Sequence, residues 1–168
     1  MPDPAPDALF SAAGAASVQR CPRCGDTTPE LSDAAECSSC GGLLDIVHAT
    51  PPAHGAALLA LFGVRAGLKP GSEPSGVWRY RELVMPSAVD PVCHPEGNTP
   101  LLARGSVQTF ARSASLILKH EGHNPTGSFK DRGMTVAVTQ ARRIGARAVA
   151  CASTGNTSAS LAAYASHA

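Results

Sequence analysis

Lys130 is the residue with the clearest chemical potential, because it follows the turn-rich residues 124–129 (NPTGSF) and opens a helical pattern. Backbone N–H groups at a helix start are unpaired and partially positive, which disfavours an ammonium group there. The neutral amine is the better nucleophile, and such a lysine can hold an aldehyde cofactor such as pyridoxal phosphate (PLP) through a Schiff base. The alternative is a surface lysine whose unfavourable position is offset by Asp131.

A second polar segment, residues 153–158 (STGNTS), follows a predicted strand over residues 147–152 and leads into a predicted helix over residues 156–167. A helix start that follows a strand binds anions through its free backbone N–H groups, so a carboxylate or phosphate would fit here. Plain N-capping is the alternative. A cap needs one polar side chain, however, and five of these six are polar.

Four cysteines form two C-x2-C pairs, Cys21 with Cys24 and Cys37 with Cys40, with twelve residues between the pairs and a glycine after each. Two thiolates from each turn can complete a tetrahedral zinc site, so the spacing predicts a zinc ribbon. All four positions would be filled, and the metal would be structural, stabilising a unit with little core of its own. A redox dithiol and an eroded metal site are the alternatives.

The composition limits the class of protein. The 168 residues carry a net charge of +1, with 43% hydrophobic and 16% charged residues, which suits one globular domain or a small module with part of a larger one. A nearly neutral chain is a poor partner for nucleic acid or an acidic membrane. Zinc ribbons often bind nucleic acid, but the cysteine segment has one basic residue, Arg23, against four acidic ones.

Neither a secretion signal nor an apolar run long enough to cross a bilayer is predicted, so we expect a cytoplasmic protein. Cytoplasmic thiols are kept reduced, which favours a metal over disulfides as the reason for the four cysteines.

The remaining patterns predict the elements that would hold these residues. They predict a short helix over residues 58–68, a loop over residues 69–76, the start of a buried segment at residues 99–102 and a strand over residues 115–119. The helix that begins at Lys130 carries an apolar face made of Phe129, Gly133, Val136, Ala137, Ala141 and Ile144.

The order strand, helix, strand, helix predicts an α/β fold with parallel strands joined by right-handed crossovers. Only two or three strands are available, fewer than a stable sheet has, and no internal repeat offers another solution. We therefore expect an incomplete parallel-sheet domain preceded by the small four-cysteine zinc ribbon.

Six segments of the chain, in order, resemble the threonine synthases, which belong to the tryptophan-synthase-β-like (fold type II) PLP-dependent enzymes. The segments are CPRCG (21–25), CSSCGGLLD (37–45), SGVWRYREL (75–83), EGNTPL (96–101), NPTGSFKDR (124–132) and ASTGNTSA (152–159). With the resemblance, the predicted division is a flexible leader over 1–20, a zinc-ribbon-like module over 21–48, a linker with short helices over 49–95, and the truncated N-terminal part of the PLP-dependent domain over 96–168.

The resemblance implies the roles of individual residues. Lys130 would form the Schiff base with PLP and shuttle protons, and Asn156 would bond the 3′ oxygen of the cofactor ring. Ser153, Thr154 and Thr157 would hold the substrate carboxylate. The glycine-rich loop for the cofactor phosphate and the partner of the pyridine nitrogen have no match here. We therefore expect these 168 residues alone to bind PLP poorly and to have no useful turnover.

The resemblance also implies a reaction, the conversion of O-phospho-L-homoserine and water to L-threonine and phosphate, carried out by a homodimer of the full-length protein. Another fold type II enzyme, a threonine dehydratase or a cysteine synthase, is one alternative, since it would share the lysine and the asparagine loop. A non-catalytic zinc-ribbon binding protein is the alternative from a different class.

Overall fold

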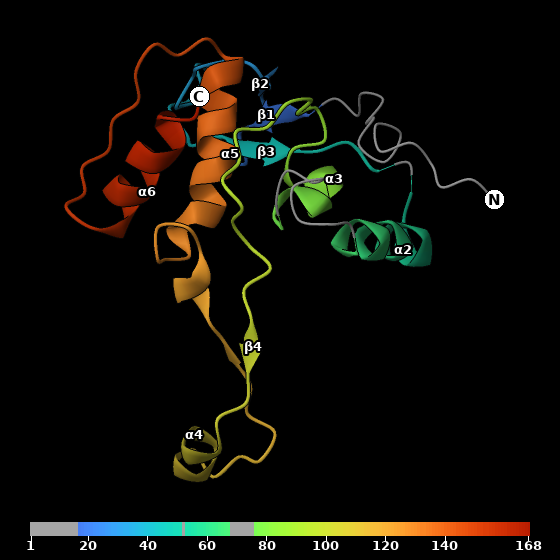
Figure 1. The fold of residues 1–168 in the computed structure, drawn as a ribbon. Helices are drawn as coiled ribbons and strands as arrows, with labels where there is room; N and C mark the ends of the chain where they lie inside the picture. The colour runs from blue at the N-terminus through green and yellow to red at the C-terminus, as the bar shows by residue number, and fades with distance from the viewer. Residues whose placement is uncertain (1–16, 52, 68–75) are drawn as a thin grey trace.

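The computed structural model describes residues 17–51, 53–67 and 76–168 (Figure 1). The predicted leader lies outside the described residues up to residue 16, and so does the predicted loop over residues 69–76 except for Gly76. The described elements mix short strands with helices, so the chain is α/β at this coarse level, as the sequence predicts. In the described ranges, no helix combines the length and the apolar character that a membrane crossing requires.

The cysteine module is built on a small antiparallel sheet of three strands, in the order β2-β1-β3. The strands are β1 (Val18–Arg20), β2 (Thr27–Pro29) and β3 (Asp45–Val47). In the central strand, Gln19 lies opposite Thr28 on one side and Ile46 on the other. The buried Gln19 amide donates to the carbonyl oxygen of Ser32 at 2.8 Å, which ties the loop between the two cysteine pairs to the sheet.

Three helical elements follow the module: α2 (Gly55–Ala66), the 3-10 helix η1 (Trp78–Tyr80) and α3 (Arg81–Val84). The first of them confirms the helix predicted over residues 58–68. The rings of Phe62 and Tyr80 meet with centroids 4.9 Å apart. The buried Arg65 donates to both carboxylate oxygens of Glu82, at 2.7 and 2.8 Å. This two-pronged ion pair holds α2 against the two shorter helices.

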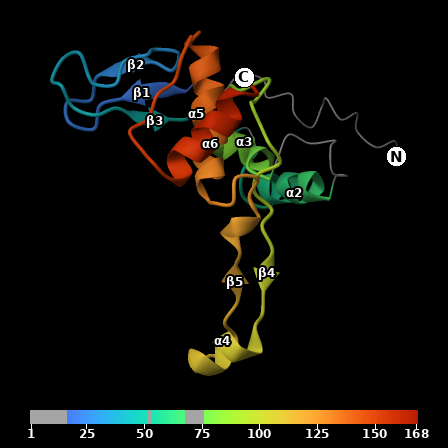
Figure 2. The same ribbon diagram turned by 60° about the vertical axis from the view of Figure 1, so that its left-hand side comes forward.

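The next elements are β4 (Leu101–Leu102), α4 (Gly105–Phe110) and β5 (Leu118–Lys119). They form an arm that extends away from the rest of the molecule (Figures 1 and 2). The predictions of a buried segment at residues 99–102 and of a strand over residues 115–119 are only partly right. Leu101 is 65% exposed and Ile117 is 57% exposed, because a two-stranded hairpin offers both faces to solvent when no further layer covers it.

The last elements are η2 (Glu121–His123), α5 (Lys130–Arg143) and α6 (Asn156–Ala165). Helices α5 and α6 pack against each other. Val138 of α5, Tyr164 of α6 and Val92, from the segment before β4, form a buried cluster. Both helices begin at or next to the residue that the sequence predicts, so the two candidate segments do lie at helix starts.

The apolar face predicted for α5 is mostly wrong, since of its six members only the half-buried Val136 is among the hydrophobic residues that pack against a described core cluster. The residues buried on this helix are Asp131, Thr135, Val138 and Thr139. Phe129, in contrast, is 57% exposed. The buried hydroxyls have partners, because Trp78 Nε1 donates to Thr135 Oγ1 at 2.7 Å and the Val92 N–H donates to Thr139 Oγ1 at 2.8 Å. A polar group that is hydrogen-bonded can be buried at little cost, and apolar spacing does not reveal such partners.

Every strand pair in the described part of the chain is antiparallel, so the expected parallel sheet is not found there. The strand predicted over residues 147–152 is wrong as well, since this segment has no strand and Val149 is 40% exposed. A strand needs a neighbour to complete its hydrogen bonds, and a parallel neighbour arrives only through a long crossover. An apolar run alone therefore does not make a strand.

Candidate functional site

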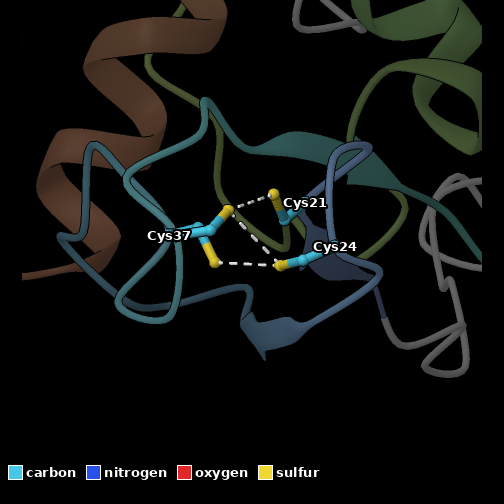
Figure 3. Close-up of side chains that lie close together, drawn as sticks. Cys21, Cys24 and Cys37 are labelled. Carbon is cyan, nitrogen blue, oxygen red and sulfur yellow. Dashed lines mark hydrogen bonds between the residues drawn. The ribbon is translucent and has the colours of Figure 1, made fainter.

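The four cysteines converge on one point, as their spacing predicts. Figure 3 labels three of them, Cys21, Cys24 and Cys37. Their Sγ atoms all lie within 4.8 Å of one another. Cys24 Sγ is 3.5 Å from the Sγ atoms of Cys37 and Cys40, and Cys21 Sγ is 3.5 Å from that of Cys40. A zinc ion with Zn–S bonds of about 2.3 Å needs sulfur atoms about 3.8 Å apart, so the cluster has the dimensions of a tetrahedral site.

Two glycines allow this convergence. Gly25 and Gly41 have φ of +84° and +67°, a left-handed conformation in which glycine avoids the strain of a side chain. Their N–H groups donate to the carbonyl oxygens of Cys21 and Cys37 at 2.9 and 2.8 Å. Each C-x2-C pair is therefore closed into a tight turn, and the site is organised by local sequence.

The thiols in this cluster influence one another. The backbone N–H of Cys24 lowers the pKa of Cys21 to about 7. The backbone N–H of Asp26 opposes an upward shift, yet hydrogen bonding to Cys40 and Cys37 raises the pKa of Cys24 to about 12. Four adjacent thiolates repel one another, so a cation is needed to hold all of them deprotonated, and metal affinity depends on pH.

Lys130 is the first residue of α5 and is half-buried, at the end of the predicted tight turn. In that turn the N–H of Gly127 donates to the carbonyl oxygen of Asn124 at 2.8 Å, and Gly127 has φ of +80°. The N–H of Lys130 donates to Ser128 Oγ at 3.3 Å. Lys130 Nζ lies 4.8 Å from the centre of the Phe129 ring and makes no ion pair with any described residue. The amine is thus not held by a carboxylate of this part of the chain.

The polar segment, residues 153–158, spans the start of α6. Ser153 and Thr157 are half-buried, and Thr154 and Asn156 are exposed. The N-cap of the helix is Gly155, and no side chain makes a cap hydrogen bond. The N–H of Gly155 instead donates to Ser153 Oγ at 3.3 Å. Plain N-capping therefore does not account for the polar residues of this segment.

The two candidate segments lie at the same end of a helix pair. Asp131 near the start of α5 accepts a hydrogen bond from Ser160 of α6, and Val138 further along packs in one cluster with Tyr164. The contacts advance in the same direction along both helices, so α5 and α6 are parallel and their N-terminal ends are adjacent (Figure 1). Among the described residues no hydrogen bond joins the Lys130 amine to the polar segment. Two helix starts at one end give a positive local potential, which suits an anion.

An ionic cluster close to Lys130 has no counterpart in the sequence prediction. Arg132 donates to the two carboxylate oxygens of Glu121 at 2.7 and 2.9 Å. Thr99 Oγ1 and Asn124 Nδ2 also donate to this carboxylate, at 2.8 and 3.0 Å. Hydrogen bonding from Arg132 lowers the pKa of Glu121 to about 2. The cluster fastens the base of the arm to α5, and only the folded turn between the two charged residues brings them together.

Glu30, from the loop between the cysteine pairs, joins the module to the C-terminal end of α5. Its carboxylate accepts hydrogen bonds from Ser87 Oγ at 2.6 Å and from Arg143 Nη1 at 3.0 Å. Its carbonyl oxygen accepts one from Gln140 Nε2 at 2.7 Å. Burial opposes the shift, but the bonds from Arg143 and Ser87 lower the pKa of Glu30. We call these four residues the Glu30 clasp.

A hollow of about 410 Å³ lies beside the C-terminal ends of α5 and α6, where Val138, Ala141 and Ala165 contribute to its lining. It is at the opposite end of the helix pair from Lys130. Its lining combines small apolar side chains with Arg142 and Arg147 and contains none of the predicted site residues, so we assign it no part in the candidate site.

Comparison with known proteins supports the chemistry suggested by this geometry. Residues 92–168 match the family described as pyridoxal-phosphate dependent enzyme. The matched range contains Lys130 and the whole polar segment at the start of α6. This part of the chain is therefore similar to PLP-dependent enzymes.

The particular proteins that the chain resembles are threonine synthases. It is 41% identical over 146 residues to threonine synthase of Methanosarcina acetivorans, which covers 86% of this chain and 33% of the relative. It is 41% identical over 150 residues to that of Methanocaldococcus jannaschii, covering 88% of this chain and 34% of the relative. It is 64% identical over 99 residues to threonine synthase of Mycobacterium leprae, and the match covers 56% of this chain and 26% of the relative. The chain thus spans about a third of the length of the first two relatives.

Proposed function

We propose that the protein with this sequence acts as a threonine synthase, converting O-phospho-L-homoserine and water to L-threonine and phosphate with PLP as cofactor. The observation that carries the proposal is Lys130 at the start of α5, in a segment that matches PLP-dependent enzymes and in a chain similar to threonine synthases over most of its length.

The residues at this end of the helix pair suit the cofactor. Lys130 is half-buried and makes no ion pair with the described residues, so its amine can take the cofactor aldehyde. We assign Asn156, exposed at the start of α6, to the 3′ oxygen of the cofactor ring. PLP, when bound, supplies an electron sink that stabilises negative charge on a substrate carbon.

We assign the substrate carboxylate to the hydroxyls of Ser153, Thr154 and Thr157. The free backbone N–H groups at the start of α6 add positive partial charge there, which favours a bound carboxylate. Lys130 would hold the cofactor, and its amine would move protons at the α, β and γ carbons of the substrate. Phosphate leaves from the γ carbon, and water adds at the β carbon.

We propose a structural zinc ion for the cluster of Cys21, Cys24, Cys37 and Cys40. The sulfur spacing fits a tetrahedral ion, and four thiolates leave no coordination position for a substrate. We further propose that the protein is cytoplasmic and acts as a homodimer. The predicted division at residues 20, 48 and 95 stays a prediction, and so does the lack of turnover in these 168 residues alone.

A substrate assay on the protein as its gene encodes it tests the proposal. O-phospho-L-homoserine should yield equal amounts of phosphate and L-threonine, and Lys130→Ala should lower the rate roughly 10²–10⁴-fold or abolish it. Borohydride reduction in the presence of PLP should fix the cofactor on Lys130 and not on Lys119, so Lys119→Ala serves as the matched control.

Other outcomes identify the alternatives. Formation of 2-oxobutanoate from threonine would point to a dehydratase, and a product from a serine-derived substrate with sulfide would point to a cysteine synthase. A Lys130→Ala protein with unchanged cellular activity and no bound PLP in the wild type would favour a non-catalytic zinc-ribbon binding protein.

A further inference from the structure

Asp131, the residue after Lys130, is fully buried although it is a carboxylate, with an exposed fraction of 0%. Burying a carboxylate is costly unless hydrogen-bond donors surround it. Asp131 Oδ2 accepts from the N–H of Thr126 at 2.7 Å, and Oδ1 accepts from Thr126 Oγ1 and from Ser160 Oγ, both at 2.5 Å. Two of these donors belong to the turn that precedes Lys130, and the third belongs to α6.

The hydrogen bond from Ser160 to Asp131 links the two helices near their N-terminal ends. Ser160 is itself fully buried and lies one helical turn after Asn156. In the described ranges it makes the one hydrogen bond that joins α5 to α6. Within the described helices, the buried threonine hydroxyls of α5 do not bond to α6. Thr135 Oγ1 donates to the carbonyl oxygen of Val92, and Thr139 Oγ1 donates to the carbonyl oxygen of Thr135 in its own helix.

We propose that Asp131 is a positioning residue that sets the Lys130 amine relative to the cofactor-binding and substrate-binding segment at the start of α6, by holding the turn before Lys130 and Ser160 at the same time. The inference rests on the proposed role of Lys130 and deepens it. A carboxylate can do this because its two oxygens accept several bonds at once, and charge-assisted bonds are short and strong. Its negative charge also suits the positive end of α5.

Asp131 does more than hold the two helices together, because its bond to α6 also fixes their relative orientation. Two packed helices can slide or tilt by small amounts while apolar contacts such as Val138 with Tyr164 persist, because such contacts are non-directional. The hydrogen bond from Ser160 to Asp131 is directional and lies within one turn of both Lys130 and Asn156. Loss of this bond should therefore change the orientation of Lys130 relative to the start of α6 without unfolding the two helices.

Ser160→Ala in the protein as its gene encodes it removes the α6 donor and leaves the two Thr126 bonds in place. The matched control is Thr139→Val, which removes another buried hydroxyl from the same helix pair, remote from Lys130. Each variant is titrated with PLP, and Lys130 labelling is measured by borohydride reduction and peptide mass spectrometry, with the Schiff-base absorption band and thermal unfolding recorded alongside.

We expect Ser160→Ala to raise the PLP concentration for half-maximal labelling about tenfold, since bonds to charged groups are the stronger ones. Thr139→Val should change it less than about twofold while losing comparable thermal stability. Asp131→Asn, which keeps the side-chain shape but loses the charge and one acceptor oxygen, should weaken labelling at least as much as Ser160→Ala.

Suppose that Lys130 is labelled in the wild-type protein. Equal labelling in Ser160→Ala and Thr139→Val, or unchanged labelling in Asp131→Asn, would then overturn the positioning role of Asp131. Absence of label on Lys130 in the wild-type protein would instead overturn the proposed function, and this inference with it. The wild-type measurement therefore separates the two failures.

Discussion

The four-cysteine cluster and the Lys130 end of the helix pair are assembled in opposite ways. The cluster takes all four side chains from residues 21–40, and two tight turns closed by Gly25 and Gly41 bring the sulfurs together. The lysine end takes its side chains from segments more than twenty residues apart, and the helices meet there through buried contacts such as that of Asp131 with Ser160. Local turns suffice to bring the four thiols of the proposed metal site together, whereas the proposed cofactor site needs anchors from distant segments.

The Glu30 clasp connects these two regions. It holds the cysteine module against the C-terminal end of α5, and Lys130 is at the other end of the same helix. A 14-residue helix is about 21 Å long, so the clasp is too far away to contact the candidate site. The contrast between the two regions can therefore be tested by disturbing either region alone and then the clasp between them.

The largest effect is expected from Cys37→Ser, which removes one thiol from the four-cysteine cluster, the proposed zinc site. Structural zinc contributes roughly 10–16 kcal/mol to small zinc modules at neutral pH, so the module should lose its metal and its fold. Metal content by mass spectrometry and amide exchange over residues 17–48 would record the loss. Cys93→Ser, a thiol outside the cluster, is the matched control and should keep one zinc per chain.

The same substitution, made in the protein as its gene encodes it, should still allow PLP to label Lys130, because the lysine end has its own anchors in Asp131 and Glu121. If PLP labelling disappears together with the zinc, the two regions are not independent and the contrast between them fails. Retention of both the metal and the module's exchange protection would contradict the assignment of Cys37 as a ligand.

A middle-sized effect is expected from Glu30→Gln, which removes the charge at the centre of the clasp. The ion pair with Arg143 is mostly buried, with side-chain exposures of 19% for Arg143 and 11% for Glu30. Loss of a charged hydrogen-bond partner there should lower the free energy of unfolding by about 1.5–3 kcal/mol. Urea unfolding would measure this, with the exposed Glu36→Gln in the same module as control.

Amide exchange measurements on Glu30→Gln would show which part of the molecule is destabilised. Faster amide exchange at the C-terminal turn of α5, with no change in the cysteine turns, is the expected pattern. An unfolding free energy equal to that of Glu36→Gln would mean that the clasp contributes nothing to holding the two regions together.

The smallest effect is expected from the pH dependence of the Glu121 cluster. Hydrogen bonding from Arg132 lowers the pKa of the Glu121 carboxyl to about 2 in the folded chain, from an ordinary value of 4.5, so the ionised form stabilises the fold. This contribution is fully present above about pH 4.5 and is lost as the pH falls from 4.5 towards 2. Because the side chain is 29% exposed, solvent screening limits the contribution to about 1 kcal/mol.

Unfolding free energies of the wild type and of Glu121→Gln, compared from pH 7 to pH 3, would test this. The difference between the two proteins should be constant above pH 5 and should shrink below it. A difference that grows as the pH falls would show that Glu121 is stabilised in its protonated form and would contradict its pairing with Arg132.

Sequence reasoning succeeded where the determining interactions are local. The cysteine pairs, the turn before Lys130 and the starts of both long helices follow from neighbouring residue types and were predicted. It failed where burial depends on partners far along the chain. The buried face of α5 holds Asp131 and two threonines, and the bonds of Thr135 to Trp78 and to Val92 lie outside any local pattern. The strand expected over residues 147–152 failed for the same reason, since a strand exists only beside a partner.

The amino-acid sequence by itself determined which side chains could do chemistry here: four thiols with metal-ligand spacing, a lysine at a helix start and a polar segment at another helix start. Tertiary structure alone decided that α5 and α6 run parallel with both starts at one end, that Asp131 is buried between them, and that Glu30 fastens the cysteine module to α5. The physical reason is range: turns and helix starts depend on backbone preferences within a few residues, whereas burial and charge pairing depend on contacts that exist only once the chain has folded.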